Sequence, residues 1–440
     1  MLRLTALVLL VLGALAAGGF LLLRSDESPS YSPLNLDDDP WAYNEERQGD
    51  FESRAAAGHS HVIYVKSPGG IVATAERVER WRPQLEAAAD ESGVDPGLIA
   101  GMVLLESAGR PDARASDDLE GAAGLTQILA ETATGLLGMR VDVARSERLT
   151  RKLARARGPR QAARIRAERA QVDERFDPEK ALAATGRYLK TAMDEFGHED
   201  LAVVSYHMGI GNLQQVLGRY GDDDASYAQL YFDASPERNP RAYRMLAGLG
   251  DDSKTYYWRV LASREAMRLY RRDRGRLEQL AELQTGAGSG ELVLHPPDRG
   301  GALETQEDVD AALDRGELRP LPEEPARYGL RPADGAGKQA LRPEAFAIAA
   351  YIGKGVRNVS GTRAPLIVTR TVRPDAGIHA TGFAFDVRRS YRSGAQAEAF
   401  QYMLDRLQAL NLIAWTRDAD TIHITASSDG RRLLDEVAPG

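Results

Sequence analysis

The sequence predicts a multidomain α+β protein, with a mainly α-helical domain followed by a small α+β domain at the C-terminus. At 440 residues, of which 43% are apolar, the chain has room for two or three domains with their own cores. Up to about residue 276 it contains capped segments with helical spacing of apolar residues. A Gly/Pro-rich stretch then precedes a segment with strand-like runs.

Composition limits what the chain can bind. Its net charge of −8 argues against nucleic acid as the main partner. The sequence contains no cysteine, which excludes disulfides, thiolate zinc sites and a lipid-modified cysteine. Any metal must therefore be held by histidine and carboxylate side chains.

Residues 1–24 are predicted to be a transmembrane anchor or a signal segment. Leu4–Leu23 is an uncharged apolar run of 20 residues, which is long enough to span a bilayer. The tripeptide at 14–16 resembles a signal-peptidase site, but the apolar run continues beyond it, which favours an uncleaved anchor over a secreted product. Both interpretations place the rest of the chain outside the cytoplasm.

Residues 25–73 are predicted to form a polar tether with one short strand. The segment 25–55 is acidic and contains prolines, while HVIYVKSPGG at 61–70 has the pattern of a strand and a turn. A helix containing Trp81 is expected to lead into the helical domain, which we place at 74–276.

The helix predicted over 95–109 carries a carboxylate on its apolar face. It begins with an Asp-Pro N-cap and ends at a glycine, with a proline shortly after. Apolar residues at 99, 102 and 103 share a helical face with Glu106. Burial disfavours the charged form, so Glu106 should have a raised pKa and could act as a general acid. The alternative is a glutamate at a helix end that turns to solvent.

Four motifs in order resemble the soluble lytic transglycosylase (SLT) family, which is related in fold to goose-type lysozyme. They are Glu106-Ser107, GLTQ at 124–127, DPEKALAATGRYL at 177–189 and VVSYHMGIGN at 203–212. The resemblance covers about Thr74 to Arg274. It implies a lysozyme-like domain that cleaves the glycan strands of peptidoglycan without a cofactor.

The resemblance also implies roles for individual residues. Glu106 would be the catalytic acid/base, Ser107 and Gln127 would lie in the sugar groove, and Tyr206 would lie across the cleft. The family usually has Tyr-Asn-Ala-Gly where this chain has Tyr-His-Met-Gly at 206–209. This departure keeps the tyrosine and the glycine but changes the local hydrogen bonding.

Three functions remain open for this domain. A lytic route needs only Glu106, which would protonate the glycosidic oxygen and then take the proton of the C6 hydroxyl as a 1,6-anhydro ring closes. A hydrolytic muramidase, or lysozyme, needs a second carboxylate about 5–9.5 Å away. Asp117 and Asp118 are the nearest candidates in the sequence. The third alternative is a non-catalytic protein that binds the cell wall.

A basic insertion at 140–170 follows GLTQ. Between 140 and 169 it has 11 Lys/Arg against three acidic residues. It is either a solvated helical hairpin broken at Gly158-Pro159 or a surface for anionic wall polymer or lipid head groups. Helices are predicted at 177–197 and at 253–273, where Tyr256 and Tyr257 are expected in the core and could also face sugar.

Residues 277–335 are predicted to be a linker with a small helix around 307–314, and residues 336–440 to carry a second site. HATGFAFD at 379–386 follows a strand-like run, and His423 comes 37 residues after Asp386. His379, Asp386 and His423 form a two-histidine, one-carboxylate set. Such a set is typical of catalytic zinc and leaves a fourth position for water.

This second arrangement resembles the VanY-like zinc D,D-carboxypeptidases and related L-alanyl-D-glutamate endopeptidases, over about 338–428. The resemblance implies a metallopeptidase-like domain that binds zinc and acts on stem peptides. Arg373 would receive the substrate carboxylate, although Arg370 replaces the usual serine. Asp420 would be the general base in place of the more usual glutamate, and its shorter side chain is expected to weaken or abolish hydrolysis.

Overall fold

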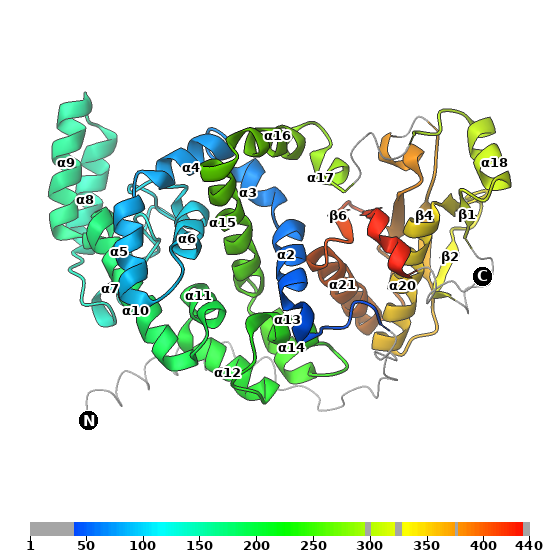
Figure 1. Cartoon of the computed structure of the whole chain (residues 1–440), viewed down its shortest axis with the longest axis horizontal. Coiled ribbons are helices and arrows are strands. Elements are labelled where there is room, and N and C mark those ends of the chain that lie inside the picture. Colours follow the sequence, from blue (N-terminus) through cyan, green and yellow to red (C-terminus); the bar gives the residue numbers. More distant parts are fainter. Residues whose placement is uncertain (1–38, 295–300, 322–327, 375–376, 434–440) are drawn as a thin grey trace.

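The computed structural model describes residues 39–294, 301–321, 328–374 and 377–433. Figure 1 shows a broad helical part (39–294) beside a smaller part in which helices and strands are combined. This arrangement agrees with the predicted α+β class. The predicted anchor at 1–24 lies outside the described residues, and no helix among the described ones is long and apolar enough to cross a membrane.

The helical part is built from α-helices joined by short loops and 3₁₀ turns. The α-helices are α2 Gln48–Gly58, α3 His61–Lys66, α4 Ile71–Glu79, α5 Arg82–Ser92, α6 Pro96–Ser107, α7 Ala130–Gly135, α8 Val143–Ala154, α9 Pro159–Val172, α10 Pro178–Phe196, α11 Glu199–Met208, α12 Ile210–Tyr220, α13 Tyr227–Asp233, α14 Pro240–Gly248, α15 Tyr256–Arg272, α16 Arg274–Thr285 and α17 Ser289–Leu292. The 3₁₀ helices are η2 Glu45–Arg47, η3 Glu174–Phe176 and η4 Asp252–Thr255.

Helix α6 lies at the centre of this part and packs most extensively against α15. As predicted, Asp95 caps α6, since its side chain accepts a hydrogen bond from the backbone N–H of Leu98. The two helices approach so closely that a Cβ on Gly101 would lie 2.7 Å from the Val260 carbonyl oxygen. The glycine therefore allows the contact that places the end of α6 against the start of α15.

Two further helical predictions are confirmed. Helix α10 begins after the Asp177 cap and ends at Gly197, which adopts the left-handed conformation. The basic insertion forms an antiparallel pair, α8 and α9, with the break at Gly158-Pro159. In Figure 1 this hairpin projects from the side of the molecule farthest from the strands.

The prediction of a short strand at 61–70 is wrong, because residues 61–66 form the helix α3. Ile63 and Tyr64 are buried where α3 packs against α15 and α16, and this packing outweighs the strand preference of the β-branched residues. The tether prediction also fails for the described residues 39–73. Trp41 and Phe51 in this segment are fully buried in the core.

Much of the predicted linker is ordered structure. Helices α16 and α17 extend the helical part, and α18 (Gln306–Asp314) matches the small helix expected there. Strand β1 (Arg319–Pro320) pairs with β3 (Ala340–Leu341). In the described part of this segment, the Gly/Pro-rich composition therefore reflects short elements and turns rather than a free spacer.

The second part contains a five-stranded sheet of order β2-β4-β5-β7-β6, in which β2 and β4 are parallel and the other pairs antiparallel. The strands are β2 Leu330–Pro332, β4 Leu366–Arg370, β5 Ala384–Arg388, β6 Ile413–Arg417 and β7 Thr421–Ala426. Helices α20 (Pro343–Ser360) and α21 (Gly394–Ala409) pack against each other and against the strands. Because β5 and β7 are neighbours, Asp386 lies directly opposite His423.

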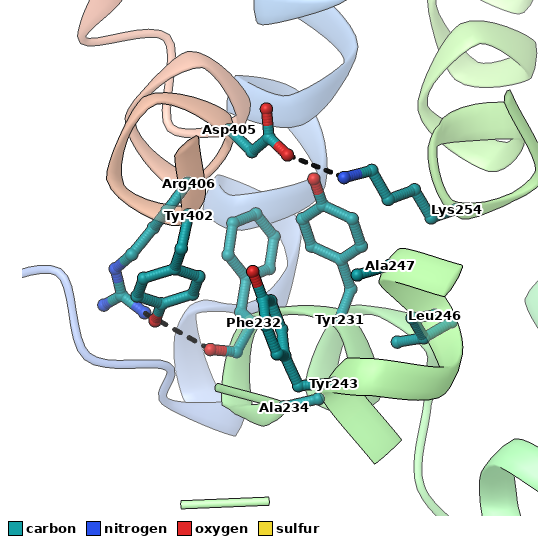
Figure 2. Close-up of a pocket in the computed structure, with 10 residues that line it drawn as sticks. All are labelled: Tyr231, Phe232, Ala234, Tyr243, Leu246, Ala247, Lys254, Tyr402, Asp405 and Arg406. Carbon is teal, nitrogen blue, oxygen red and sulfur yellow. Dashed lines mark hydrogen bonds and ion pairs between the residues drawn. The ribbon is translucent and has the colours of Figure 1, made fainter. Parts of the chain in front are cut away.

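The two parts share one hydrophobic core. Figure 2 shows α21 against α13 and α14, where aromatic side chains from both parts line a cavity of about 40 Å³. The guanidinium of Arg406 donates to the carbonyls of Phe232 and Trp41 and forms an almost fully buried ion pair with Asp39, at 3.1 Å. Nearby, the ammonium of Lys254 lies 2.6 Å from Asp405.

Arg406→Ala should destabilise the protein, because it leaves Asp39 and two backbone carbonyls buried without their partner. Removing one partner of a buried ion pair costs about 3–5 kcal/mol. The measurement is urea unfolding of both proteins. Arg431→Ala is the control, since Arg431 forms an exposed pair with Glu344 and its loss should cost less than about 1 kcal/mol. Equal effects of the two substitutions would contradict the role given to Arg406.

Candidate functional site

Glu106 lies in the last turn of α6, where its carboxylate faces α15. The hydroxyl of Tyr256, the first residue of α15, donates a 2.8 Å hydrogen bond to Glu106 Oε1. Burial raises the pKa of Glu106 to about 7, although Tyr256 and the positive charge of Arg259 act in the opposite direction. The expected raised pKa is therefore present, and the alternative of a solvent-facing glutamate is not what the structure shows.

A cavity of about 230 Å³ opens beside Glu106. Helix α3 and the end of α6 form its walls, and Lys66, Arg110 and Arg259 are the cations that line it. Of the described residues around this cavity, Glu106 is the only carboxylate. The pocket thus combines one protonatable acid with a positively charged lining.

The hydrolytic alternative depended on Asp117 or Asp118. The Asp117 side chain is fully exposed and pairs with Arg114, and Asp118 accepts a hydrogen bond from the backbone N–H of Glu120. Neither aspartate contributes to the electrostatic surroundings of Glu106. The structure therefore does not bring either of them to the site as a second carboxylate.

Of the other residues expected around Glu106, the structure places Tyr206 within its electrostatic surroundings and gives Gln127 and Ser107 local backbone partners. The Tyr206 hydroxyl donates to the Thr126 carbonyl at 2.8 Å, and the charge of Glu106 helps to raise the Tyr206 pKa after burial. Gln127 has a positive φ of 52°, and its side-chain amide donates to the Gly124 carbonyl. Ser107 is buried, and its hydroxyl donates back to the α6 backbone at Val103. These contacts position the residues, and their roles in binding sugar stay predictions.

Tyr256 was not assigned a role at Glu106 from the sequence, which only placed it in the core or near sugar. Its ring stacks on His207 with a centroid distance of 4.8 Å, and the His207 ring nitrogen Nδ1 lies 2.9 Å from the Ser253 hydroxyl. The histidine of the unusual Tyr-His-Met-Gly sequence therefore supports the tyrosine that bonds Glu106. A hydrogen bond between residues 150 positions apart leaves no local pattern in the sequence that would predict it.

The second predicted site is also assembled. One ligand atom each from His379, Asp386 and His423 lies within 4.8 Å of the others, and all three residues are buried. Asp386 Oδ1 lies 2.8 Å from His423 Nδ1 and 3.3 Å from His379 Nε2. Burial alone would raise the Asp386 pKa, but the two histidines outweigh it and hold that pKa well below its usual value.

The environment of His379 fits a metal ligand. Its Nδ1 lies 3.0 Å from the Thr371 carbonyl oxygen, which can only accept, so Nδ1 carries a proton and Nε2 is the nitrogen that faces the cluster. Nε2 is buried without a hydrogen-bond partner and lies 3.3 Å from a carboxylate oxygen of Asp386. This contact is favourable when either a second ring proton or a bound cation lies between the two atoms.

His423 has a second carboxylate on its far side. Glu291, from α17, lies with Oε1 3.2 Å from His423 Nε2. A carboxylate behind the free nitrogen of a ligating histidine orients the ring and raises its basicity. Sequence reasoning missed Glu291 because it lies in the predicted linker, 132 positions before the histidine that it contacts.

Arg373 and Asp420 are placed less favourably for their expected roles. Arg373 is exposed, and only its backbone N–H approaches the cluster, at 3.4 Å from the His379 carbonyl. Asp420 lies in the exposed turn between β6 and β7, and among the described residues no hydrogen bond or ion pair joins its side chain to the cluster. Arg370, by contrast, approaches Asp386 Oδ2 to 3.5 Å and so competes for the same carboxylate.

Residues 84–229 match the family model of the transglycosylase SLT domain. The match includes Glu106, Gln127 and Tyr206, and it ends before Tyr256 and before the second site. At the level of the family it implies peptidoglycan cleavage of the lytic transglycosylase type. No curated protein matches the chain.

The raised pKa of Glu106 should make stability depend on pH. The folded protein keeps this proton at pH values where the unfolded chain has lost it, so the contribution is complete below about pH 4.5 and is lost as the pH rises through about 7. Glu106→Gln removes this dependence. We expect the variant to be more stable than the wild type by about 3 kcal/mol at pH 8, and by less than about 1 kcal/mol at pH 5.

The measurement is urea unfolding of both proteins at the two pH values. The control Glu131→Gln changes an exposed glutamate on α7 and should show no such difference. A constant gap between the wild type and Glu106→Gln would mean that Glu106 titrates at an ordinary pKa.

Proposed function

We propose that the helical part is a peptidoglycan lytic transglycosylase that uses Glu106 as its single acid and base. The observation that carries this proposal is a glutamate with a pKa of about 7 beside a cavity that contains no other carboxylate among its described lining residues. A protonated glutamate can donate to the oxygen of the MurNAc–GlcNAc bond. The match over 84–229 supports the same reaction class.

The reaction then needs no second acidic residue. As the glycosidic bond breaks, Glu106 gives its proton to the leaving oxygen and becomes a carboxylate. The C6 hydroxyl of MurNAc attacks the anomeric carbon, and Glu106 takes its proton as the 1,6-anhydro ring closes. The Tyr256 hydrogen bond to Oε1 stabilises the carboxylate form between these two steps. Hydrolysis would require a base to activate water, which favours the lytic route over a muramidase.

Glu106→Gln should abolish glycan cleavage, because the amide can neither give nor take the proton. The loss should be on the order of 10²–10⁴-fold or more, the range for general acid–base catalysis. Digests of purified peptidoglycan are analysed by mass spectrometry of the muropeptides, with Glu131→Gln as the matched control. The wild type should yield 1,6-anhydro ends. Reducing MurNAc ends would identify a muramidase instead, and intact strands would identify a non-catalytic wall-binding protein.

We further propose that His379, Asp386 and His423 bind one zinc ion, with stem peptides as the substrate. The buried His379 Nε2, which has no hydrogen-bond partner and lies 3.3 Å from Asp386, supports this assignment. When bound, zinc would supply a Lewis acid and an activated water. Asp386 and the two imidazoles would hold the ion, and Glu291 would orient His423.

Because peptidoglycan lies outside the cytoplasm, we propose an extracytoplasmic location, with Leu4–Leu23 as membrane anchor or signal.

The full chain should contain close to one zinc by elemental analysis, and His379→Ala should lose it while the control His198→Ala keeps it. Glu291→Gln should weaken zinc affinity about 10- to 100-fold in competition with a chromophoric chelator, the usual effect of losing a carboxylate behind a ligating histidine. A wild type without zinc would contradict the metal site. A wild type with zinc that leaves stem peptides intact would make this part a binding module.

A further inference from the structure

The hairpin α8–α9 carries a positive surface that the proposed reaction does not use. Residues 143–172 contain ten Lys/Arg and only two acidic residues, in a chain whose net charge is −8. Six of these cations are exposed and, within the described part of the chain, their side chains have no hydrogen-bond or ion-pair partner: Arg148, Lys152, Arg155, Arg157, Arg160 and Arg164. Arg148 and Lys152 share one face of α8, and Arg155 is the C-cap residue that follows the helix.

The base of the hairpin is fixed to the loops that flank Glu106. Asp112, five residues after the end of α6, forms ion pairs with Arg166 and Arg169 of α9. At the end of α9, the fully buried Asp173 binds Ser146 of α8 and the fully buried Arg175. Both helices of the hairpin are therefore fixed by side-chain contacts, α9 through Asp112 and α8 through Asp173.

Arg175 extends this connection to the loop that carries Gln127. Its guanidinium donates to the backbone carbonyls of Leu119, Gly121 and Ile128. On the other side of the site, Arg110 precedes Asp112 by two residues and lines the cavity beside Glu106. The hairpin is thus attached to the segment that contributes Arg110 to the cavity and to the loop that carries Gln127. The cavity lining itself contains Lys66, Arg110 and Arg259.

We propose that the hairpin binds the ionised carboxylates of stem peptides on the glycan strand whose bond lies at Glu106. This proposal rests on the proposed function and narrows its substrate to strands with free stem-peptide carboxylates. Guanidinium groups match carboxylates in geometry, and a strand that leaves the cavity carries such groups at intervals. An array of weak exposed ion pairs would hold the polymer by their sum and release it at high salt.

A lipid surface fits the hairpin less well. Helices that lie on membranes present an apolar face to the acyl chains. Here Leu149, Ile165 and Val172 are buried between the helices of the hairpin, and the exposed large apolar residues of the described chain, Val65, Leu129 and Leu136, lie elsewhere. The exposed surface of the hairpin, all of which the structure describes, is therefore positively charged and carries no exposed large apolar side chain that could enter the acyl layer.

The test is a charge reversal in the full chain, Arg148→Glu with Lys152→Glu and Arg155→Glu. The matched control reverses three exposed arginines on α14 and α15 that have no ion-pair partner among the described residues: Arg241→Glu, Arg244→Glu and Arg272→Glu. Co-sedimentation with insoluble peptidoglycan gives the Kd. The hairpin variant should bind roughly 3- to 150-fold more weakly at low salt, the combined effect of losing three exposed ion pairs, and the control should bind like the wild type.

Two further arms identify the ligand. Peptidoglycan whose carboxyl groups have been converted to amides should bind the wild type as weakly as native peptidoglycan binds the hairpin variant. Vesicles with anionic phospholipid should not distinguish the wild type from the variant. KM for glycan cleavage should rise more than kcat falls, because the hairpin contacts the strand away from the reacting bond.

Unchanged affinity of the hairpin variant for peptidoglycan would overturn the inference. So would a loss confined to anionic vesicles, which would assign the hairpin to a membrane. A wild type that binds peptidoglycan through the hairpin but does not cleave it would overturn the proposed reaction and leave the inference standing. Cleavage that does not depend on the hairpin charges would overturn the inference and leave the proposed reaction standing.

Discussion

The contact between α6 and α15 is the constraint on which the candidate site depends. Gly101 lets the two backbones approach, and this approach puts the Tyr256 hydroxyl on Glu106 and leaves the carboxylate partly buried beside the cavity. Burial and the hydrogen bond act on the pKa in opposite directions, and burial prevails. The result is a glutamate that can exchange a proton near neutral pH, which is what a one-carboxylate mechanism requires.

Features of this site that depend on neighbouring residues could be predicted from the sequence. Contacts between residues far apart in the sequence could not. The Asp95 cap, the apolar face of α6 and the position of Glu106 on it all follow from short-range spacing, and the structure has them. The contacts that Tyr256 and Glu291 make could not be predicted, because each contacts a residue more than a hundred positions away in the sequence. Such contacts depend on how the helices pack against one another. No short stretch of the sequence determines this packing, which depends on the whole fold.

The same reasoning explains where the fold was predicted incorrectly. The apolar run in 61–66 suits a strand by composition, yet packing on α15 and α16 makes it a helix that walls the Glu106 cavity. The segment 277–335 appeared to separate two domains, but Arg406 and Asp39 join the two parts through a buried ion pair. The His379–Asp386–His423 set was predicted from the HATGFAFD motif and a later histidine, and the pairing of β5 with β7 brings Asp386 opposite His423.

The most direct test of the central claim is a titration of Glu106 itself. The side-chain carboxyl carbon of Glu106 can be followed by NMR across pH in protein labelled at glutamate, and assigned from the spectrum of Glu106→Gln. The packing of α6 on α15 predicts a midpoint of about 7. A midpoint near the ordinary glutamate value of about 4.3 would mean that the carboxylate is solvated and charged at neutral pH, which would contradict its role as the acid.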